Sequence, residues 1–150
     1  MISTIFQLYL ENALKNAQLT SSSIEAASSV SGGSVNRAFK LQSGGKSFFL
    51  KVNQLDAFPK MFDKEILGLD LLRKSSAITV PKVLLKGEFE EQAYLVLEFV
   101  ETSQPTKNYW KLFGEGLAEL HQNSAQMFGL EYNNYNGSLV QVNDFKSDWT

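Results

Sequence analysis

Residues 31–53 read SGGSVNRAFKLQSGGKSFFLKVN and contain two glycine pairs, two short apolar runs and one lysine inside the second run. The pair Gly44-Gly45 separates the two runs, which is typical of a β-hairpin. Glycine adopts the positive φ angles of a tight hairpin turn more readily than any other residue. We therefore expect strands over residues 35–42 and 47–53, joined by a tight turn at the glycines.

Apolar periodicity outside this hairpin predicts the remaining elements. A helix is expected over 3–17, a strand over 26–31, and a helix over 60–74 whose apolar stripe contains Phe62, Ile66, Leu69 and Leu72. The runs KVLLKGEFE and QAYLVLEFV predict a second hairpin. The segment NYWKLFGEGLAELHQNSAQ predicts another helix, whose apolar face of Trp110, Phe113, Leu117 and Leu120 is suited to burial against a partner surface. The chain after Phe128 shows no clear period.

The composition excludes several classes of protein. A length of 150 residues with 43 % hydrophobic residues suits an ordinary domain with a real core. A net charge of -2 gives no general attraction to nucleic acid or to an anionic membrane. With no cysteine and one histidine, disulfides, thiolate chemistry and a His-rich metal site are excluded. No signal peptide or long apolar run is evident, so we expect a cytoplasmic protein.

The first glycine pair is a candidate anion site. Gly32 and Gly33 precede the expected strand, and successive backbone N–H groups without a Cβ can form a concave site for a phosphate. The glycines alone favour the alternative of an ordinary tight turn. The stretch matches neither the Walker loop nor the Rossmann fingerprint, so the glycines need support from other residues.

That support comes from Lys51 and Glu65. Lys51 follows Leu50 and precedes Val52, and a charged lysine on the inner face of a sheet requires a partner, although it could instead face water. Glu65 lies at the edge of the apolar stripe of the next helix and is either that partner or a surface glutamate. The two residues together are less easily attributed to chance than either one.

The order of these features resembles the amino-terminal lobe of protein-kinase-like phosphotransferases. More narrowly, the chain resembles the fructosamine kinase (ketosamine-3-kinase) family, which is close to the aminoglycoside phosphotransferases. The matching stretches are SGGSVNRAFKL, FFLKVN, MFDKEILGLDLL, VPKVLLKG, YLVLEFV, LAELH and FGLEYNNYNGSLVQVNDFKSDW. They cover nearly all of residues 28–150.

The resemblance implies an α+β fold. Residues 1–100 would form a nucleotide-binding lobe with a leading helix, built on an antiparallel sheet of about five strands with one inserted helix. Residues 101–150 would begin a mostly helical substrate lobe, which is incomplete here.

The resemblance also implies residue roles. Gly32, Gly33 and Ser34 would form the loop over the ATP phosphates, Lys51 would contact the α- and β-phosphates, and Glu65 would hold Lys51. The backbone of Glu98 and Val100 would meet adenine, with Phe99 between them. Val35, Val52 and Leu97 could line the purine, although strand aliphatics more often belong to a core.

The family continues to a catalytic loop of the form HGDLWxGN, and no His-Gly-Asp run occurs in this sequence. The resemblance therefore assigns no catalytic or metal-binding residue here, and the Mg²⁺ ligands are expected beyond residue 150. His121 is better explained as a packing or capping residue. Asp144 and Asp148 are better explained as parts of an irregular acidic tail.

The function implied is ATP-dependent phosphorylation of small-molecule or protein-bound ketosamines, leading to deglycation. We expect this chain to be a truncated form without measurable catalysis. The alternatives are a small-molecule kinase of the aminoglycoside phosphotransferase or choline kinase type, and a noncatalytic binding module. Exposure of the helical segment 109–127 would favour dimerisation.

Overall fold

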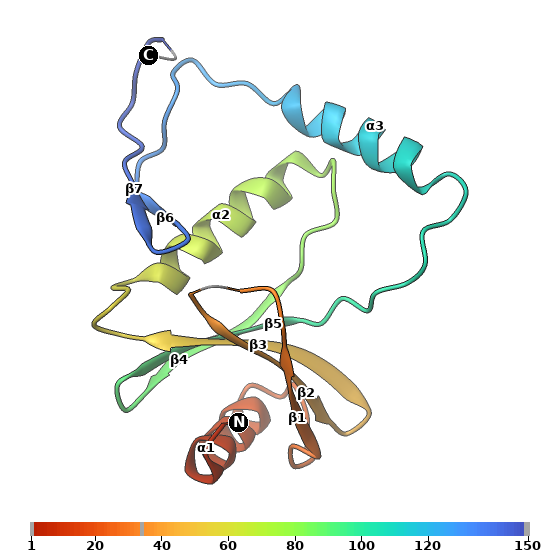
Figure 1. The fold of residues 1–150 in the computed structure, drawn as a ribbon, viewed down its shortest axis with the longest axis vertical. Coiled ribbons are helices and arrows are strands. Elements are labelled where there is room, and N and C mark those ends of the chain that lie inside the picture. The colour runs from red at the N-terminus through yellow and green to blue at the C-terminus, as the bar shows by residue number, and fades with distance from the viewer. Residues whose placement is uncertain (1, 34, 149–150) are drawn as a thin grey trace. The chain divides into compact units, whose positions relative to one another are not determined.

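The computed structural model describes residues 2–33 and 35–148. The chain divides into two compact units, one formed by residues up to 62 with 81–100, the other by residues 63–80 with the chain from 101 onward. Its elements in order are α1 (Thr4–Asn16), β1 (Ala26–Val30), β2 (Arg37–Ser43), β3 (Lys46–Gln54), α2 (Met61–Ser75), β4 (Val83–Phe89), β5 (Gln92–Glu98), α3 (Tyr109–His121), β6 (Asn134–Asn136) and β7 (Leu139–Gln141) (Figure 1).

The first unit contains a five-stranded sheet in the order β1-β2-β3-β5-β4. Every neighbouring pair of its strands is antiparallel. Helix α2 follows β3 along the chain and precedes β4. The predicted sheet with one helix inserted between its third and fourth strands is thereby confirmed.

The turn at Gly44-Gly45 has the predicted conformation, with φ angles of 57° and 74°. It connects β2 to β3 in the register Ser43↔Lys46. The first strand of the hairpin begins later than expected, at Arg37, so Val35 precedes β2. The glycine-rich loop continues up to Arg37. The alternation of apolar residues that predicted the strand therefore placed its beginning two residues too early.

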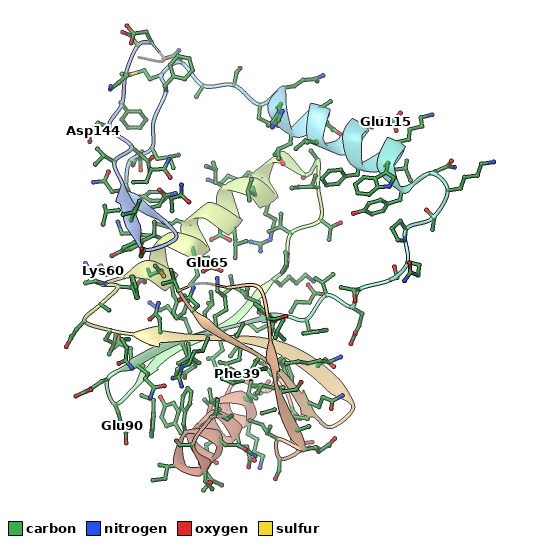
Figure 2. All side chains as sticks on the ribbon, viewed as in Figure 1. Phe39, Lys60, Glu65, Glu90, Glu115 and Asp144 are labelled. Carbon is green, nitrogen blue, oxygen red and sulfur yellow. The ribbon has the colours of Figure 1, made fainter. Side chains whose placement is uncertain are left out.

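One face of the sheet packs against α1 and forms the core (Figure 1). Alternate residues of a strand point to opposite faces, so the buried set on β3 consists of Phe48, Leu50 and Val52. These residues pack with a wider buried cluster that includes Phe6, Leu10, Leu14, Phe39, Leu41, Tyr94 and Val96. Figure 2 shows Phe39, which lies in this cluster, beside the helix.

Local polar contacts join α1 to the strands that follow it. Ser3 caps the helix, because its Oγ accepts a hydrogen bond from the Phe6 N–H at 3.2 Å. The buried Glu11 carboxylate accepts a hydrogen bond from the Ile24 N–H at 3.0 Å. This bond fixes the chain between the helix and β1.

The second unit contains most of α2 together with α3 and the β6–β7 hairpin. Of the predicted apolar stripe on α2, Phe62 is buried, Ile66 and Leu69 are half-buried, and Leu72 is exposed. Helix α3 forms and has no buried residue. Its apolar face, which needs a partner surface for burial, is exposed at Trp110 and Phe113 and half-buried at Leu117 and Leu120. Periodicity identifies an apolar face, whereas burial requires a second surface against that face.

The irregular reading of residues after Phe128 missed the β6–β7 hairpin. Its turn contains Gly137 with a φ of 61°, and the pair Asn136-Gly137 is a strong hairpin signal. The side chain of Asn143 supports the hairpin by donating to the Tyr132 carbonyl at 3.1 Å and to Asn134 Oδ1 at 3.0 Å.

Across the described ranges 2–33 and 35–148, the helices are too short or too polar to cross a membrane.

Candidate functional site

The glycine-rich loop joins β1 to β2 (Figure 1). Gly32 has a φ of 124°, which strains any residue with a side chain, and its surroundings leave open space for a Cβ. A Cβ on Gly33 would lie 3.1 Å from the Asn36 carbonyl oxygen, which is a tight contact. Both glycines are exposed, so the loop presents bare backbone to solvent. Ser34, the third predicted residue of this loop, lies outside the described residues.

Lys51 lies on the face of the sheet opposite the α1 core. In the ladder it pairs with Ala38 on β2 and with Leu95 on β5. Its Nζ lies 6.0 Å from the centroid of the Phe62 ring, within reach of a cation–π contact. The lysine is half-buried, and its ammonium lies near the Phe62 side chain at the start of α2.

Glu65 lies on α2 and is half-exposed (Figure 2). Because Lys51 belongs to the first compact unit and Glu65 to the second, the pairing of the two residues stays a prediction.

The segment after β5 contains the predicted adenine-contacting residues. The Glu98 N–H donates to the Lys82 carbonyl at 2.9 Å, and its carboxylate accepts from the Lys82 N–H at 3.3 Å. Because the Glu98 N–H already donates to Lys82, the Glu98 carbonyl oxygen is the backbone group of this residue that could accept a hydrogen bond from a ligand. Val100, which follows, is exposed.

Phe99 is held by two side chains from the sheet. Lys40 Nζ lies 4.3 Å from the centroid of its ring, and the Phe49 ring centroid lies 6.4 Å away. Phe49 pairs with Leu97 across β3 and β5, so Leu97 shares the face of Lys51. Val52 faces the α1 core instead, which supports the core interpretation of Val52 over the purine wall.

A buried asparagine that the sequence reading did not identify lies next to these residues. Asn53 is 5 % exposed, and its Nδ2 donates to Asn36 Oδ1 at 3.1 Å and to Met61 Sδ at 3.4 Å. The alternation along β3 places it on the same face as Lys51. The sequence signal that could have indicated this residue is a polar side chain at the end of the apolar run of a strand.

The described residues offer few side chains arranged to bind a metal ion. Within residues 2–33 and 35–148, no three His, Cys, Asp or Glu side chains gather in a group that could hold a metal ion. The described residues therefore offer exposed glycine backbone, a half-buried lysine and a backbone carbonyl after β5, which suit a phosphate-bearing ligand with a planar base.

The five-stranded antiparallel sheet, its inserted helix and its strand lysine define the amino-terminal lobe of a protein-kinase-like fold. Comparison with known sequences gives the family: the profile described as "Fructosamine kinase" matches residues 7–150. The chain belongs to the fructosamine kinase family.

Two relatives illustrate the similarity. A "Probable ketoamine kinase" of Enterococcus faecium is 37% identical over 80% of this chain and 41% of its own length. The "Protein-ribulosamine 3-kinase, chloroplastic" of Arabidopsis thaliana is 36% identical over 81% of this chain and 37% of its own length. The chain thus spans less than half the length of these relatives.

Solved structures agree with this assignment. A crystal structure of a "Putative fructosamine-3-kinase" from Haemophilus somnus superposes with a TM-score of 0.82 at 26% identity, covering 93% of this chain and 48% of that one. A protein of the same description from Thermobifida fusca gives a TM-score of 0.71 at 28% identity, covering 91% of this chain and 47% of that one. A spectinomycin phosphotransferase shares the fold, with a TM-score of 0.55 at 21% identity over 79% of this chain and 38% of that one.

Proposed function

We propose that this chain forms the ATP-binding part of a kinase that phosphorylates a hydroxyl group of ketosamines, which are amines modified by a sugar. The observation that carries the proposal is the position of Lys51, on the sheet face opposite the α1 core and close to the first turn of α2. Membership of the fructosamine kinase family supports the proposal that this lysine and the glycine-rich loop bind the same ligand.

The proposed roles follow from the chemistry of each group. The exposed backbone of Gly32 and Gly33, with Ser34, would surround the phosphates, because N–H groups without a Cβ can approach an anion closely. Lys51 would neutralise the charge of the α- and β-phosphates, and Glu65 would orient Lys51. At the end of β5, the Glu98 carbonyl and the Val100 N–H would contact the edge of adenine, with Phe99 between them.

Phosphoryl transfer depends on positioning the phosphates and neutralising their charge. ATP supplies the phosphoryl group, and this chain's residues would bind and orient it. We assign no Mg²⁺ ligand among the described residues, which contain no suitable cluster. The sequence has no His-Gly-Asp run, so we expect nucleotide binding without turnover from this chain. The ketosamine phosphorylated by the whole kinase would be unstable and would release the unmodified amine. The proposed reaction therefore leads to deglycation, which we expect in the cytoplasm.

The test is a thermal-shift measurement with and without Mg-ATP. Lys51→Ala should weaken nucleotide binding about 10- to 100-fold, because a hydrogen bond to a charged group contributes about 1.5–3 kcal/mol. The Mg-ATP-induced rise in melting temperature should shrink accordingly. The matched control is Lys46→Ala, which removes one positive charge from the other end of the same strand.

Comparing each variant with and without nucleotide removes its effect on basal stability, including the loss of the Lys46 hydrogen bond to the Leu19 carbonyl. Equal shifts in the unmodified chain, Lys51→Ala and Lys46→Ala would contradict the role of Lys51. No shift in the unmodified chain at millimolar Mg-ATP would favour the noncatalytic binding module over the kinase.

A further inference from the structure

Asn53 connects three parts of the first compact unit through one amide nitrogen. It lies near the end of β3, and its Nδ2 donates both to Asn36, which follows the glycine-rich loop, and to the sulfur of Met61, the first residue of α2. The side chain is 5 % exposed. A buried polar group with two such contacts determines the relative position of the segments it joins.

The sheet register explains why the two asparagines meet. Arg37 pairs with Val52, so continuing the antiparallel register beyond the end of β2 brings Asn36 opposite Asn53. Asn53 and Lys51 are alternate residues of β3 and share a face. The hydrogen bond therefore lies on the sheet face of the proposed nucleotide site, between the glycine-rich loop and the lysine strand.

Stability alone does not explain an asparagine at this buried position. Its Oδ1 has no hydrogen-bond partner within the described part of the chain. A buried acceptor that has lost water without gaining a donor destabilises the folded state, and an apolar side chain of similar shape would avoid this. The nitrogen of the side-chain amide is the atom that makes hydrogen bonds, and one of them holds Asn36.

The glycine-rich loop has a particular need for such a contact. Gly32 adopts a φ of 124°, and Gly33 lies close to the Asn36 carbonyl oxygen. Glycines lose the most conformational freedom when they are ordered, so a loop built on them must be held by its ends. β1 ends at Val30 on one side, and Asn36 precedes β2 on the other.

We propose that the Asn36–Asn53 hydrogen bond is a positioning contact that pre-orders the glycine-rich loop for nucleotide phosphates. This inference rests on the proposed function. Neither asparagine needs to touch the nucleotide. The bond lowers the entropy lost by the loop on binding, so that its removal weakens affinity without removing a ligand contact.

The principal test measures Mg-ATP affinity and melting temperature together in Asn36→Ala, Asn53→Leu and the double variant. Each single variant should raise the Mg-ATP dissociation constant about 3- to 30-fold, as expected when one ordering contact is lost. The double variant should be no weaker than the weaker single variant, because both remove the same bond. Asn53→Leu should keep or raise the melting temperature, since it removes the unpaired acceptor.

The matched control is Gln54→Leu, which replaces an amide by leucine at the next, exposed position of β3. It should bind Mg-ATP like the unmodified chain. A second readout, amide hydrogen exchange at Gly32, Gly33 and Val35 without nucleotide, should be faster in Asn36→Ala and Asn53→Leu. Asn36→Asp retains an acceptor oxygen for Asn53 Nδ2, so exchange at these three amides should stay as slow as in the unmodified chain.

The outcomes separate this inference from the proposed function. Unchanged Mg-ATP affinity in Asn36→Ala and Asn53→Leu, with a normally binding unmodified chain, would overturn the positioning contact. If the unmodified chain binds no Mg-ATP, the proposed function fails, and hydrogen exchange then decides: faster loop exchange in Asn53→Leu supports the loop contact, and unchanged exchange overturns it.

Discussion

Gly87 and Tyr94 face each other across β4 and β5. A Cβ at position 87 would lie 2.4 Å from the Tyr94 hydroxyl oxygen, so the tyrosine requires a glycine opposite it. Tyr94 has little room to move, because its ring also contacts Phe6 at 5.9 Å and Tyr9 at 6.0 Å between centroids. At this position the glycine is needed for space and not for its backbone conformation.

Gly87→Ala should lower the free energy of unfolding by about 1–3 kcal/mol, the usual cost of adding a methyl group to a filled site. Urea denaturation followed by circular dichroism measures the change. The control is Gly68→Ala on α2, where a Cβ meets open space and helix propensity predicts a gain of about 0.5–1 kcal/mol. Equal denaturation midpoints for both variants would contradict the close packing of Tyr94.

The ionisation of Tyr94 is also controlled by its environment. Burial, assisted by the neighbouring Tyr9 hydroxyl, raises the pKa of Tyr94 above its ordinary value. The folded protein therefore keeps the proton at a pH where the unfolded chain has lost it. Below the unfolded pKa of about 10 this contribution to stability is complete, and it decreases as the pH rises above that value.

We expect the free energy of unfolding to fall above about pH 10, by up to about 1.4 kcal/mol per pH unit from this one group. Tyr94→Phe should lose that part of the slope. Urea denaturation of both proteins between about pH 8 and pH 11 measures the difference, and titrating groups that do not interact with Tyr94 cancel in the comparison. Parallel pH profiles for the two proteins would show that Tyr94 ionises freely.

At the scale of elements, α1 is an integral part of the sheet's core. Phe6, Leu10 and Leu14 are buried against strand residues. The Tyr9 hydroxyl donates to the Glu88 carbonyl at 3.1 Å, and its ring contacts Phe89. The leading helix therefore supports the β4–β5 hairpin from the face opposite the proposed nucleotide site.

Leu10→Ala should lower the free energy of unfolding by about 2–5 kcal/mol, because it leaves a cavity among side chains that cannot fully collapse. Leu8→Ala on the same helix is the control, since Leu8 is 55% exposed and its change should stay within about 0.5 kcal/mol. Thermal denaturation measures both. A small effect at both positions would mean that α1 detaches readily from the sheet.

The elements differ in how well the sequence predicts them. The α1, α2 and β-hairpin assignments rest on strong periodicity and on glycine turns, and all are confirmed. Helix α3 ends at His121, where the LAELH run was expected to end a helix, and the Asn123 side chain donates to the Glu119 and Leu120 carbonyls there. The strands β6 and β7 are too short for a periodic signal, and side-chain amides such as that of Asn143 support them.

At the scale of the whole molecule, α3 carries an exposed apolar surface. Trp110 is 70% exposed, Leu112 is 62% exposed and Phe113 is 50% exposed. The rings of Tyr109 and Phe113 stack at 6.1 Å, so the aromatic side chains form one contiguous group. Exposed apolar groups of this kind promote association in water.

We expect the chain to self-associate through α3 as its concentration rises. In sedimentation velocity, the weight-average mass should increase with concentration for the unmodified chain and much less for Trp110→Lys/Phe113→Lys. The control Gln122→Lys/Gln126→Lys adds the same charge at exposed polar positions and should associate like the unmodified chain. Equal masses for all three proteins would exclude this surface as the contact.

For the candidate site, the sequence alone predicted the glycine-rich loop and Lys51 through their spacing and their resemblance to one family. It could not identify the Asn36–Asn53 bond, because an asparagine at a strand end has the same local pattern whether it is buried or solvated. In the folded protein Asn53 also donates to Met61, a residue from the following helix. The pairing of Lys51 with Glu65 stays a prediction.

The sequence by itself determined the type and order of the main elements, the Gly44-Gly45 turn and the family. The elements and the turn depend on local properties, namely the repeat of apolar residues and the backbone freedom of glycine, whereas the family was given by the resemblance of whole stretches of sequence. Only the tertiary structure decided that α1 covers the face of Val52 and not that of Lys51, and that Asn53 is buried. A strand pattern distinguishes its two faces, but which face is covered depends on contacts between segments distant in the chain.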